Sequence, residues 1–148
     1  NHERGLRAGT ENVAQIVGLG EAAKIAADDM AEELVRIEDL RDRLEQSLRT
    51  QHPGLRINAS GAERLPNTLS ISFSGMNALE LMSNMSDLLM SAGAACHSGD
   101  GKGSGVLEAM GVSLGYQLGT LRLSLGRFCD VEMVDQVTKI FSNSMNKN

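Results

Sequence analysis

The most constraining pattern in the sequence is helical and covers about residues 11–50. In its second half, apolar side chains recur every three or four residues, the spacing of one face of an α-helix. This stripe consists of Met30, Leu34, Ile37, Leu40 or Arg41, Leu44 and Leu48. The other face is charged, and His52-Pro53-Gly54 ends the pattern. A helix of this kind either connects two domains or has an ordinary solvated face.

The segment before this helix reads as a loop. Residues 1–12 are polar, and Gly5 and Gly9 interrupt them. Thr10 is a suitable N-cap, because its hydroxyl can accept from the first free amides of a helix. Gly18 and Gly20 lie in the Ala-rich first half of the helix, where they predict a break or close packing.

After the long helix, the chain alternates short strands with helices. We expect strands at 55–59, 68–74 and 121–125, a strand or turn at 90–95, and helices at 76–89, at 106–110 and from 130 or 131 onward. Residues predicted to face inward are Leu69, Ile71 and Phe73 in the strand, and Leu79, Met82, Met85, Leu88 and Leu89 in the helix. The order predicts an α+β fold with helices on one face of a small sheet. We therefore expect residues 1–50 to form a loop and long connecting helix, and residues 51–148 a small α+β domain.

Composition excludes several classes of partner. The 148 residues carry a net charge of −5 without a Lys/Arg block, which argues against nucleic acid or an anionic membrane surface. No stretch approaches the roughly 20 apolar residues of a membrane span, and no signal-peptide pattern is present. With only Cys96 and Cys129, we expect reduced thiols and a cytoplasmic protein. The first residue is Asn1, so a fragment or a processed piece is possible.

Cys96 is the best candidate for chemistry. It lies where the small-residue segment 91–95 meets a glycine-rich loop, and the neighbouring His97 would favour the reactive thiolate. A buried, inert thiol is the alternative. Cys129 stands next to Asp130 at a helix start and is interpreted as structural.

Two further positions suit anionic ligands. Arg122 projects from a strand whose alternate residues are apolar, and a guanidinium there can bind a carboxylate through two parallel hydrogen bonds. The alternative is an exposed edge residue. Thr10, beside a helix N-terminus, suits a phosphate, with simple capping as the alternative. No metal site is expected, because His2, His52, His97 and the two cysteines lack ligand spacing.

Four ordered blocks carry a family resemblance. They are His-Glu-Arg-Gly-Leu-Arg-Ala-Gly-Thr-Glu-Asn (2–12), Leu-Pro-Asn-Thr (65–68), Ser-Ala-Gly-Ala-Ala-Cys-His-Ser (91–98) and Leu-Arg-Leu-Ser-Leu-Gly-Arg (121–127). Together they resemble the C-terminal part of NifS-like cysteine desulfurases and selenocysteine lyases. These enzymes belong to the class V aminotransferase group with the pyridoxal-phosphate fold type I. The Cys-His-Ser ending resembles the selenocysteine lyase branch.

The resemblance implies a role for each matching residue. Cys96 would take sulfur or selenium from L-cysteine or L-selenocysteine as a persulfide or selenopersulfide, leaving L-alanine. Thr10 would contact the phosphate of pyridoxal phosphate from the neighbouring subunit of a homodimer. Arg122 would hold the substrate α-carboxylate. An acceptor protein or a reductant would then receive the chalcogen.

One part of the family pattern is missing. The Schiff-base lysine of the family lies in a His-Lys motif upstream of the first block, and none of Lys24, Lys102, Lys139 and Lys147 follows a histidine. We therefore expect that this chain alone neither holds pyridoxal phosphate nor turns over substrate. Two alternatives stay open: a non-catalytic module that carries chalcogen on Cys96 or pairs with a partner, and an unrelated thiol hydrolase that uses Cys96 and a histidine.

Overall fold

The computed structural model describes residues 3–93 and 103–145. The chain forms two compact units, Asn1–Glu33 and Leu34–Asn148. Helix α1 (Val13–Gln51) runs through both, so its two halves have different surroundings. The domain boundary expected between residues 50 and 51 stays a prediction.

The first unit contains the short 3-10 helix η1 (Glu3–Gly5) and the beginning of α1. The N-cap of α1 is Asn12, whose Oδ1 accepts from the amide of Gln15 at 3.3 Å. Its carbonyl accepts from the amide of Ile16 at 3.0 Å. The prediction that Thr10 caps this helix is therefore wrong: Thr10 lies two residues before the residue that makes the capping bonds.

The first half of α1 is held by local propensity rather than by burial. Residues 12–32 are all exposed, and Ala, Leu, Glu and Lys, which favour helix, are frequent among them. The helix continues through Gly18 and Gly20, and a Cβ at either would meet nothing within 4 Å. The break predicted at these glycines is therefore wrong, and no described residue packs closely against them.

The second unit is built on a four-stranded antiparallel sheet. Its strands are β1 (Arg56–Ile57), β2 (Thr68–Ser72), β3 (Ser91–Ala92) and β4 (Thr120–Ser124), in the order β1-β2-β4-β3. The longest strand pairing is between β2 and β4, and its register runs from Thr68 opposite Ser124 to Ser72 opposite Thr120. Each predicted strand is present: β1, β2 and β3 are shorter than predicted, and β4 begins one residue earlier than the predicted strand 121–125.

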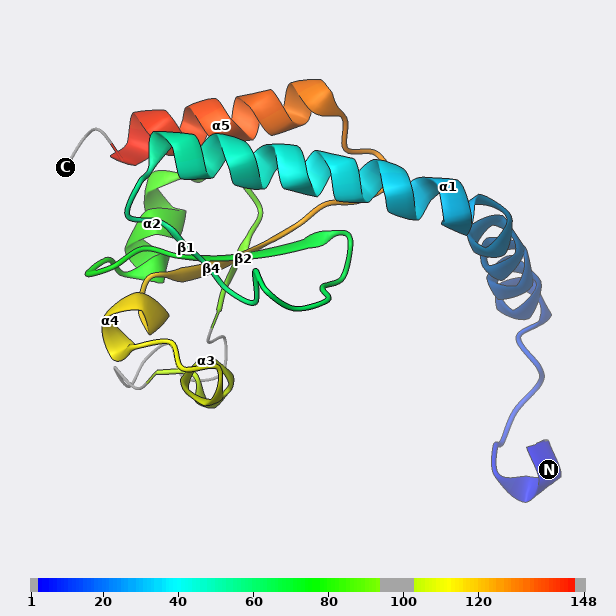
Figure 1. Ribbon diagram of the computed structural model, residues 1–148. Helices are drawn as coiled ribbons and strands as arrows, with labels where there is room; N and C mark the ends of the chain where they lie inside the picture. The colour runs from blue at the N-terminus through cyan, green and yellow to red at the C-terminus, as the bar shows by residue number, and fades with distance from the viewer. Residues whose placement is uncertain (1–2, 94–102, 146–148) are drawn as a thin grey trace. The chain divides into compact units, whose positions relative to one another are not determined.

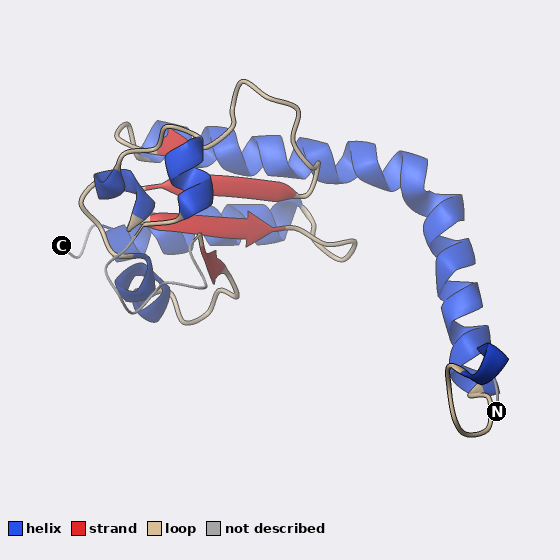
Figure 2. Ribbon diagram, turned by 90° about the horizontal axis from the view of Figure 1, so that it is seen from below, coloured by secondary structure: helices blue, strands red, loops and turns tan. Residues whose placement is uncertain are grey.

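One face of this sheet carries the core. The second half of α1 and helix α5 (Val131–Met145) lie side by side on this face, as Figures 1 and 2 show. The two helices and strands β2 and β4 contribute these buried residues to the core: Ile37, Leu40, Leu44, Leu48, Leu69, Ile71, Leu121, Leu123, Val134 and Phe141. This arrangement confirms the α+β fold with a long helix at its start. No helix in the described part of the chain is long and apolar enough to span a membrane.

Helix α2 (Ala78–Asn84) is shorter than the predicted helix 76–89. Asn77 caps it by accepting from the amide of Leu79 at 2.9 Å, so the helical face begins at Ala78 and includes Leu81. Leu79 and Leu89, which were predicted to face inward, are 48% and 101% exposed. The prediction for these two is wrong because α2 turns Ala78 and Leu81 to the core, which leaves Leu79 on another face, and because Leu89 lies beyond the end of the helix.

Two short helices lie on the other side of the sheet (Figure 1). They are α3 (Gly105–Ala109), within the predicted region, and α4 (Leu114–Gln117), which was not predicted. Ser104 caps α3 by accepting from the amide of Leu107 at 3.4 Å. Residues in and around α3 line a hollow on this side of the sheet.

His52, just after α1, is held against the core by aromatic contact. Its ring meets Phe73 edge-on with centroids 5.7 Å apart, and Phe73 in turn stacks on Phe141 at 6.2 Å. The Nε2 atom of His52 is buried and has no hydrogen-bond partner in the described part of the chain. Burial lowers the pKa of His52 from its ordinary value of 6.5, because the charged imidazolium loses hydration there.

This burial predicts a pH dependence of stability. Because the pKa of His52 is lower in the folded state, the unfolded chain binds more protons below about pH 6.5, and the free energy of unfolding falls as the pH falls through that value. We expect urea unfolding of the chain to show a larger loss of stability between about pH 7.5 and pH 5.5 than unfolding of His52→Phe. At pH 7.5 the variant should be equally stable or about 1 kcal/mol more stable, since no polar atom is left unpaired. If the free energy of unfolding falls equally with pH in the two proteins, His52 is not the source of the pH dependence.

Candidate functional site

The side of the sheet on which α3 and α4 lie contains a hollow of about 460 Å³. We call it the Arg122 hollow. It is lined by Asn58 and Ala59 after β1, by Glu63, Arg64 and Leu65 of the following loop, by Thr68 and Ser70 of β2, by Gly93 after β3, by Ser104, Val106, Leu107 and Met110 in and around α3, and by Arg122 of β4. All of these residues belong to the second unit.

Arg122 lies in the middle of the sheet. Its strand is flanked by β2 and β3, and the residue pairs with Ser70 on one side and Ser91 on the other. The alternation in β4 leaves Arg122 exposed on the face opposite Leu121 and Leu123, as predicted. The reading of Arg122 as an edge residue is wrong, because the strand order places β3 beyond β4.

Among the described residues, the guanidinium of Arg122 has a single hydrogen-bond partner. Its Nη2 donates to Ser91 Oγ at 3.4 Å, and among the described residues it forms no ion pair. Since a guanidinium has five N–H donors in a planar fork, most of them are left for a ligand. The site therefore has the donor set that a carboxylate needs.

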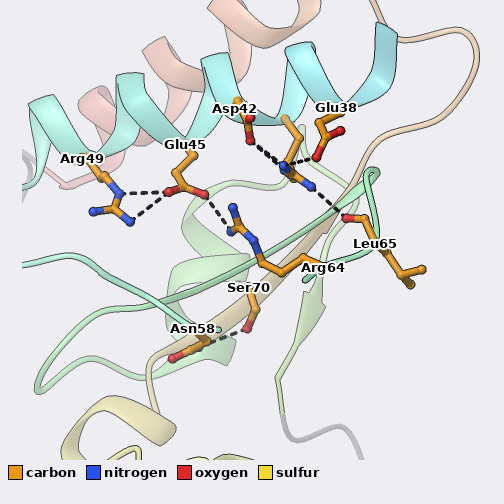
Figure 3. Close-up of polar contacts among 9 residues, drawn as sticks. Glu38, Asp42, Glu45, Arg49, Asn58, Arg64, Leu65 and Ser70 are labelled. Atoms are coloured by element: carbon orange, nitrogen blue, oxygen red, sulfur yellow. Dashed lines mark hydrogen bonds and ion pairs between the residues drawn. The ribbon is translucent and has the colours of Figure 1, made fainter. Parts of the chain in front are cut away.

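The second guanidinium of the hollow is already paired. Arg64 Nη1 lies 2.8 Å from Glu45 Oε2, and Glu45 also pairs with Arg49 at 2.9 Å (Figure 3). Both Arg64 and Glu45 are largely buried, at 17% and 14% side-chain exposure, so this pair is screened less than a surface pair. Arg64 therefore serves to attach the loop to α1.

A buried arginine attaches the same loop one turn earlier on α1. Arg41 is 4% exposed and donates to the carbonyl of Leu65 at 3.1 Å. Its charge is balanced by Glu38 at 2.9 Å and Asp42 at 2.7 Å. These bonds fix the position of the loop that forms one wall of the Arg122 hollow.

A row of hydrogen bonds crosses the sheet beside the hollow. Asn58 Nδ2 donates to Ser70 Oγ at 3.1 Å and to Ser72 Oγ at 2.8 Å. Ser72 and Thr120 share a hydrogen bond of 2.7 Å, and Thr120 Oγ1 donates to the carbonyl of Tyr116 at 2.9 Å. The row joins β1, β2, β4 and α4 at positions that are buried except for Ser70 and Tyr116.

Gly93 brings β3 close to β4. Its amide donates to the carbonyl of Thr120 at 2.8 Å, and a Cβ at this position would lie 2.4 Å from Thr120 Cγ2. Gly93 and Ser104 both line the hollow. Between them, residues 94–102 lie outside the described residues, and this segment includes Cys96 and His97.

Thr10 belongs to the first unit and Arg122 to the second. Thr10 is exposed, and its carbonyl accepts from Arg7 Nη1 at 3.5 Å. Arg7 also pairs with Glu11 at 3.5 Å. In the described part of the chain the Thr10 hydroxyl has no hydrogen-bond partner and stands just before the N-terminus of α1, which fits a phosphate group.

Cys129, Lys24 and Lys139 do not line the Arg122 hollow. Cys129 is half-buried against the core and its Sγ accepts from the amide of Gly126 at 3.3 Å. Lys24 lies in α1 and Lys139 in α5, and neither lines the Arg122 hollow. No group of three or more His, Cys, Asp or Glu within residues 3–93 and 103–145 is arranged to hold a metal ion.

Two residues of the site, Asn58 and Ser70, were not found from the sequence. The alternation in residues 68–74 already places Ser70 on the face opposite Leu69, which is the face of Arg122. The sequence pattern does not show that β2 pairs with β4. This pairing makes Ser70 the neighbour of Arg122.

Comparisons with known proteins agree with this architecture. The aminotransferase class-V family model matches residues 1–137. A cysteine desulfurase IscS from Anaeromyxobacter sp. (strain K) is 40% identical over 146 residues, and one from Enterobacter sp. (strain 638) is 37% identical over the same length. In each case the match covers 99% of this chain and 36% of the relative.

Solved structures show the same fold. A NifS-like protein from Rickettsia africae ESF-5 superposes with a TM-score of 0.82 at 26% identity, covering 98% of this chain and 38% of the other. A second NifS-like protein superposes with a TM-score of 0.80 at 32% identity, covering 99% and 37%. The chain thus spans little more than a third of the length of these relatives. Because the family model matches most of its residues, the chain belongs to the class-V aminotransferase family.

Proposed function

We propose that this chain forms part of a pyridoxal-phosphate enzyme that removes sulfur or selenium from L-cysteine or L-selenocysteine and leaves L-alanine. The observation that carries the proposal is Arg122, a guanidinium without an acidic partner in the described chain that lines a hollow of about 460 Å³. Similarity to proteins named cysteine desulfurase over 99% of the chain supports it. Because those relatives are enzymes, a non-catalytic module is not favoured.

Arg122 would bind the α-carboxylate of the substrate. A planar guanidinium can donate two parallel N–H bonds to the two oxygens of a carboxylate, which determines the orientation of the amino acid as well as its affinity. Arg64 does not compete for this ligand, because Glu45 already pairs with it. The amino-acid substrate would therefore be held by its carboxylate at the centre of the sheet.

Cys96 would receive the chalcogen. It is three residues from Gly93, so chain connectivity keeps its Cα within about 11 Å of a residue that lines the hollow. Its thiolate would attack the substrate sulfur, forming an S–S bond as the Cβ–S bond breaks, and Cβ would gain a proton to give alanine. The persulfide on Cys96 then passes its terminal sulfur to an acceptor protein or a reductant.

Thr10 would contribute to the cofactor site. Its exposed hydroxyl beside the start of α1 suits a phosphate group, and we propose that it serves the neighbouring subunit of a homodimer. Pyridoxal phosphate, when bound, supplies the electron sink that weakens bonds at the substrate carbons. A reducing cytoplasm would suit a thiol that must stay free between turnovers.

The test is alanine formation by the protein as its gene encodes it, supplied with pyridoxal phosphate. We expect one alanine for each sulfide released from L-cysteine in the presence of excess thiol, and the corresponding ratio for selenide from L-selenocysteine. The ratio of the two rates shows which chalcogen the enzyme prefers. If neither amino acid gives alanine above the level without protein, the proposed function is wrong.

A further inference from the structure

The geometry points to Ser70 as a second donor to the substrate carboxylate, with Asn58 as the residue that orients its hydroxyl. This inference rests on the proposed function, because it places the carboxylate of the amino acid in the Arg122 hollow. Ser70 and Arg122 are direct cross-strand partners on β2 and β4, and both line that hollow. Side chains at such a pair share one face of the sheet.

The hydrogen-bond row determines which group of Asn58 faces the serines. Thr120 Oγ1 gives its single proton to the carbonyl of Tyr116, so the bond between Thr120 and Ser72 must use the proton of Ser72. Ser72 then acts as an acceptor toward Asn58, and only the amide NH₂ of Asn58 can donate to it. The orientation of the Asn58 amide follows from this chain of donors.

The same amide group determines the role of Ser70. The second N–H of Asn58 Nδ2 is directed at Ser70 Oγ, so this hydroxyl oxygen accepts from Asn58 and keeps its own proton. Among the described residues that proton has no acceptor. Ser70 therefore has its own O–H proton available as a donor to the hollow beside Arg122.

The orientation leaves one buried atom of Asn58 unpaired. Asn58 is 1% exposed and lines the hollow, yet its Oδ1 has no hydrogen-bond partner in the described chain. A buried acceptor without a partner costs about 1–3 kcal/mol and calls for an explanation. Turning the amide over would set Oδ1 against Ser72 Oγ, whose proton already goes to Thr120, and the other N–H bonds of the row would be lost. The bonds to the two serines therefore determine the orientation, although Oδ1 stays unpaired.

The prediction is tested by binding of L-alanine, the carboxylate-bearing product, followed by NMR of the backbone amides of the chain. We expect L-alanine to shift the amides of Ser70 and Arg122, and L-alaninamide, which lacks the carboxylate, to leave them unchanged. Ser70→Ala should weaken the binding of L-alanine about tenfold, the loss of one hydrogen bond to a charged group. Arg122→Ala should weaken it more.

Two variants separate the hydroxyl from effects on folding. Ser70→Thr keeps the hydroxyl on a strand residue and should bind L-alanine as the original chain does. Ser124→Ala removes a hydroxyl from the same face of β4, at a position that does not line the hollow, and should also leave binding unchanged. In the protein as its gene encodes it, Ser70→Ala should raise KM for the amino acid with little change in kcat.

The inference is overturned if Ser70→Ala binds L-alanine as tightly as the original chain, if L-alaninamide shifts the same amides equally, or if L-alanine shifts neither amide. Failure of the proposed function gives a different result, in which L-alanine binds beside Ser70 and Arg122 as described but neither L-cysteine nor L-selenocysteine yields alanine.

Discussion

Replacing Cys96 by alanine is expected to abolish alanine formation from L-cysteine, with a loss of at least about 1,000-fold in kcat. The reason is chemical: the methyl group of alanine has no lone pair with which to attack the substrate sulfur, so the Cβ–S bond has no acceptor for its sulfur atom. Binding of the substrate carboxylate at Arg122 should be preserved, and KM should therefore change much less than kcat.

Cys129→Ala is the matched control for this variant. It also removes one thiol, but Cys129 is half-buried against the core and its Sγ accepts a bond from the amide of Gly126. Its activity should stay within about twofold of the original protein. Mass spectrometry after incubation with L-cysteine should find one added sulfur on the original protein and on Cys129→Ala, and none on Cys96→Ala. Undiminished alanine formation by Cys96→Ala would refute the assignment of the nucleophile.

Gly119→Ala is expected to destabilise the second unit by about 3 kcal/mol. A Cβ at this position would lie 2.2 Å from the carbonyl oxygen of Phe73 and 3.1 Å from that of Met76. Both contacts are with backbone, which cannot turn aside as the end of a long side chain can. The carbonyl of Gly119 also accepts from the amide of Phe73 at 3.1 Å, so separating the two segments costs that bond as well.

The measurement is urea unfolding followed by circular dichroism, with Gly115→Ala as the control. Gly115 lies in α4, and a Cβ there would meet nothing within 4 Å, so its replacement should leave stability unchanged or raise it by up to about 1 kcal/mol. A change of less than about 1 kcal/mol in Gly119→Ala would contradict the backbone contact between this turn and the end of β2.

Several elements could be predicted because their signal is local. The stripe Ile37, Leu40, Leu44 and Leu48 repeats at helical spacing, and all four are buried in the core. The alternation of Leu69 and Ile71 marks a strand with one buried face, and both are fully buried. The last helix begins next to Asp130, whose Oδ1 accepts from the amide of Met133 at 2.8 Å, as its residue type suggests.

Local pattern failed where tertiary contacts determine the outcome. Gly18 and Gly20 resemble helix breakers, yet α1 continues through them, since the neighbouring residues favour helix. Leu79 lies in a helix as predicted, but packing buries the face of Ala78 and Leu81 and leaves Leu79 exposed. Arg64 and Arg122 are equivalent in sequence as basic residues, but only the fold brings Glu45 against Arg64.

By itself, the sequence determined the types of the main elements and the face on which Arg122 lies, because side-chain periodicity within one strand or helix is a short-range property. Its four family blocks also determined that the chain resembles the NifS-like enzymes. Only the tertiary structure placed β4 between β2 and β3, made Ser70 the neighbour of Arg122 and directed the amide of Asn58 at Ser70. Strand order and hydrogen-bond direction depend on contacts between residues far apart in the chain, and no local pattern encodes them.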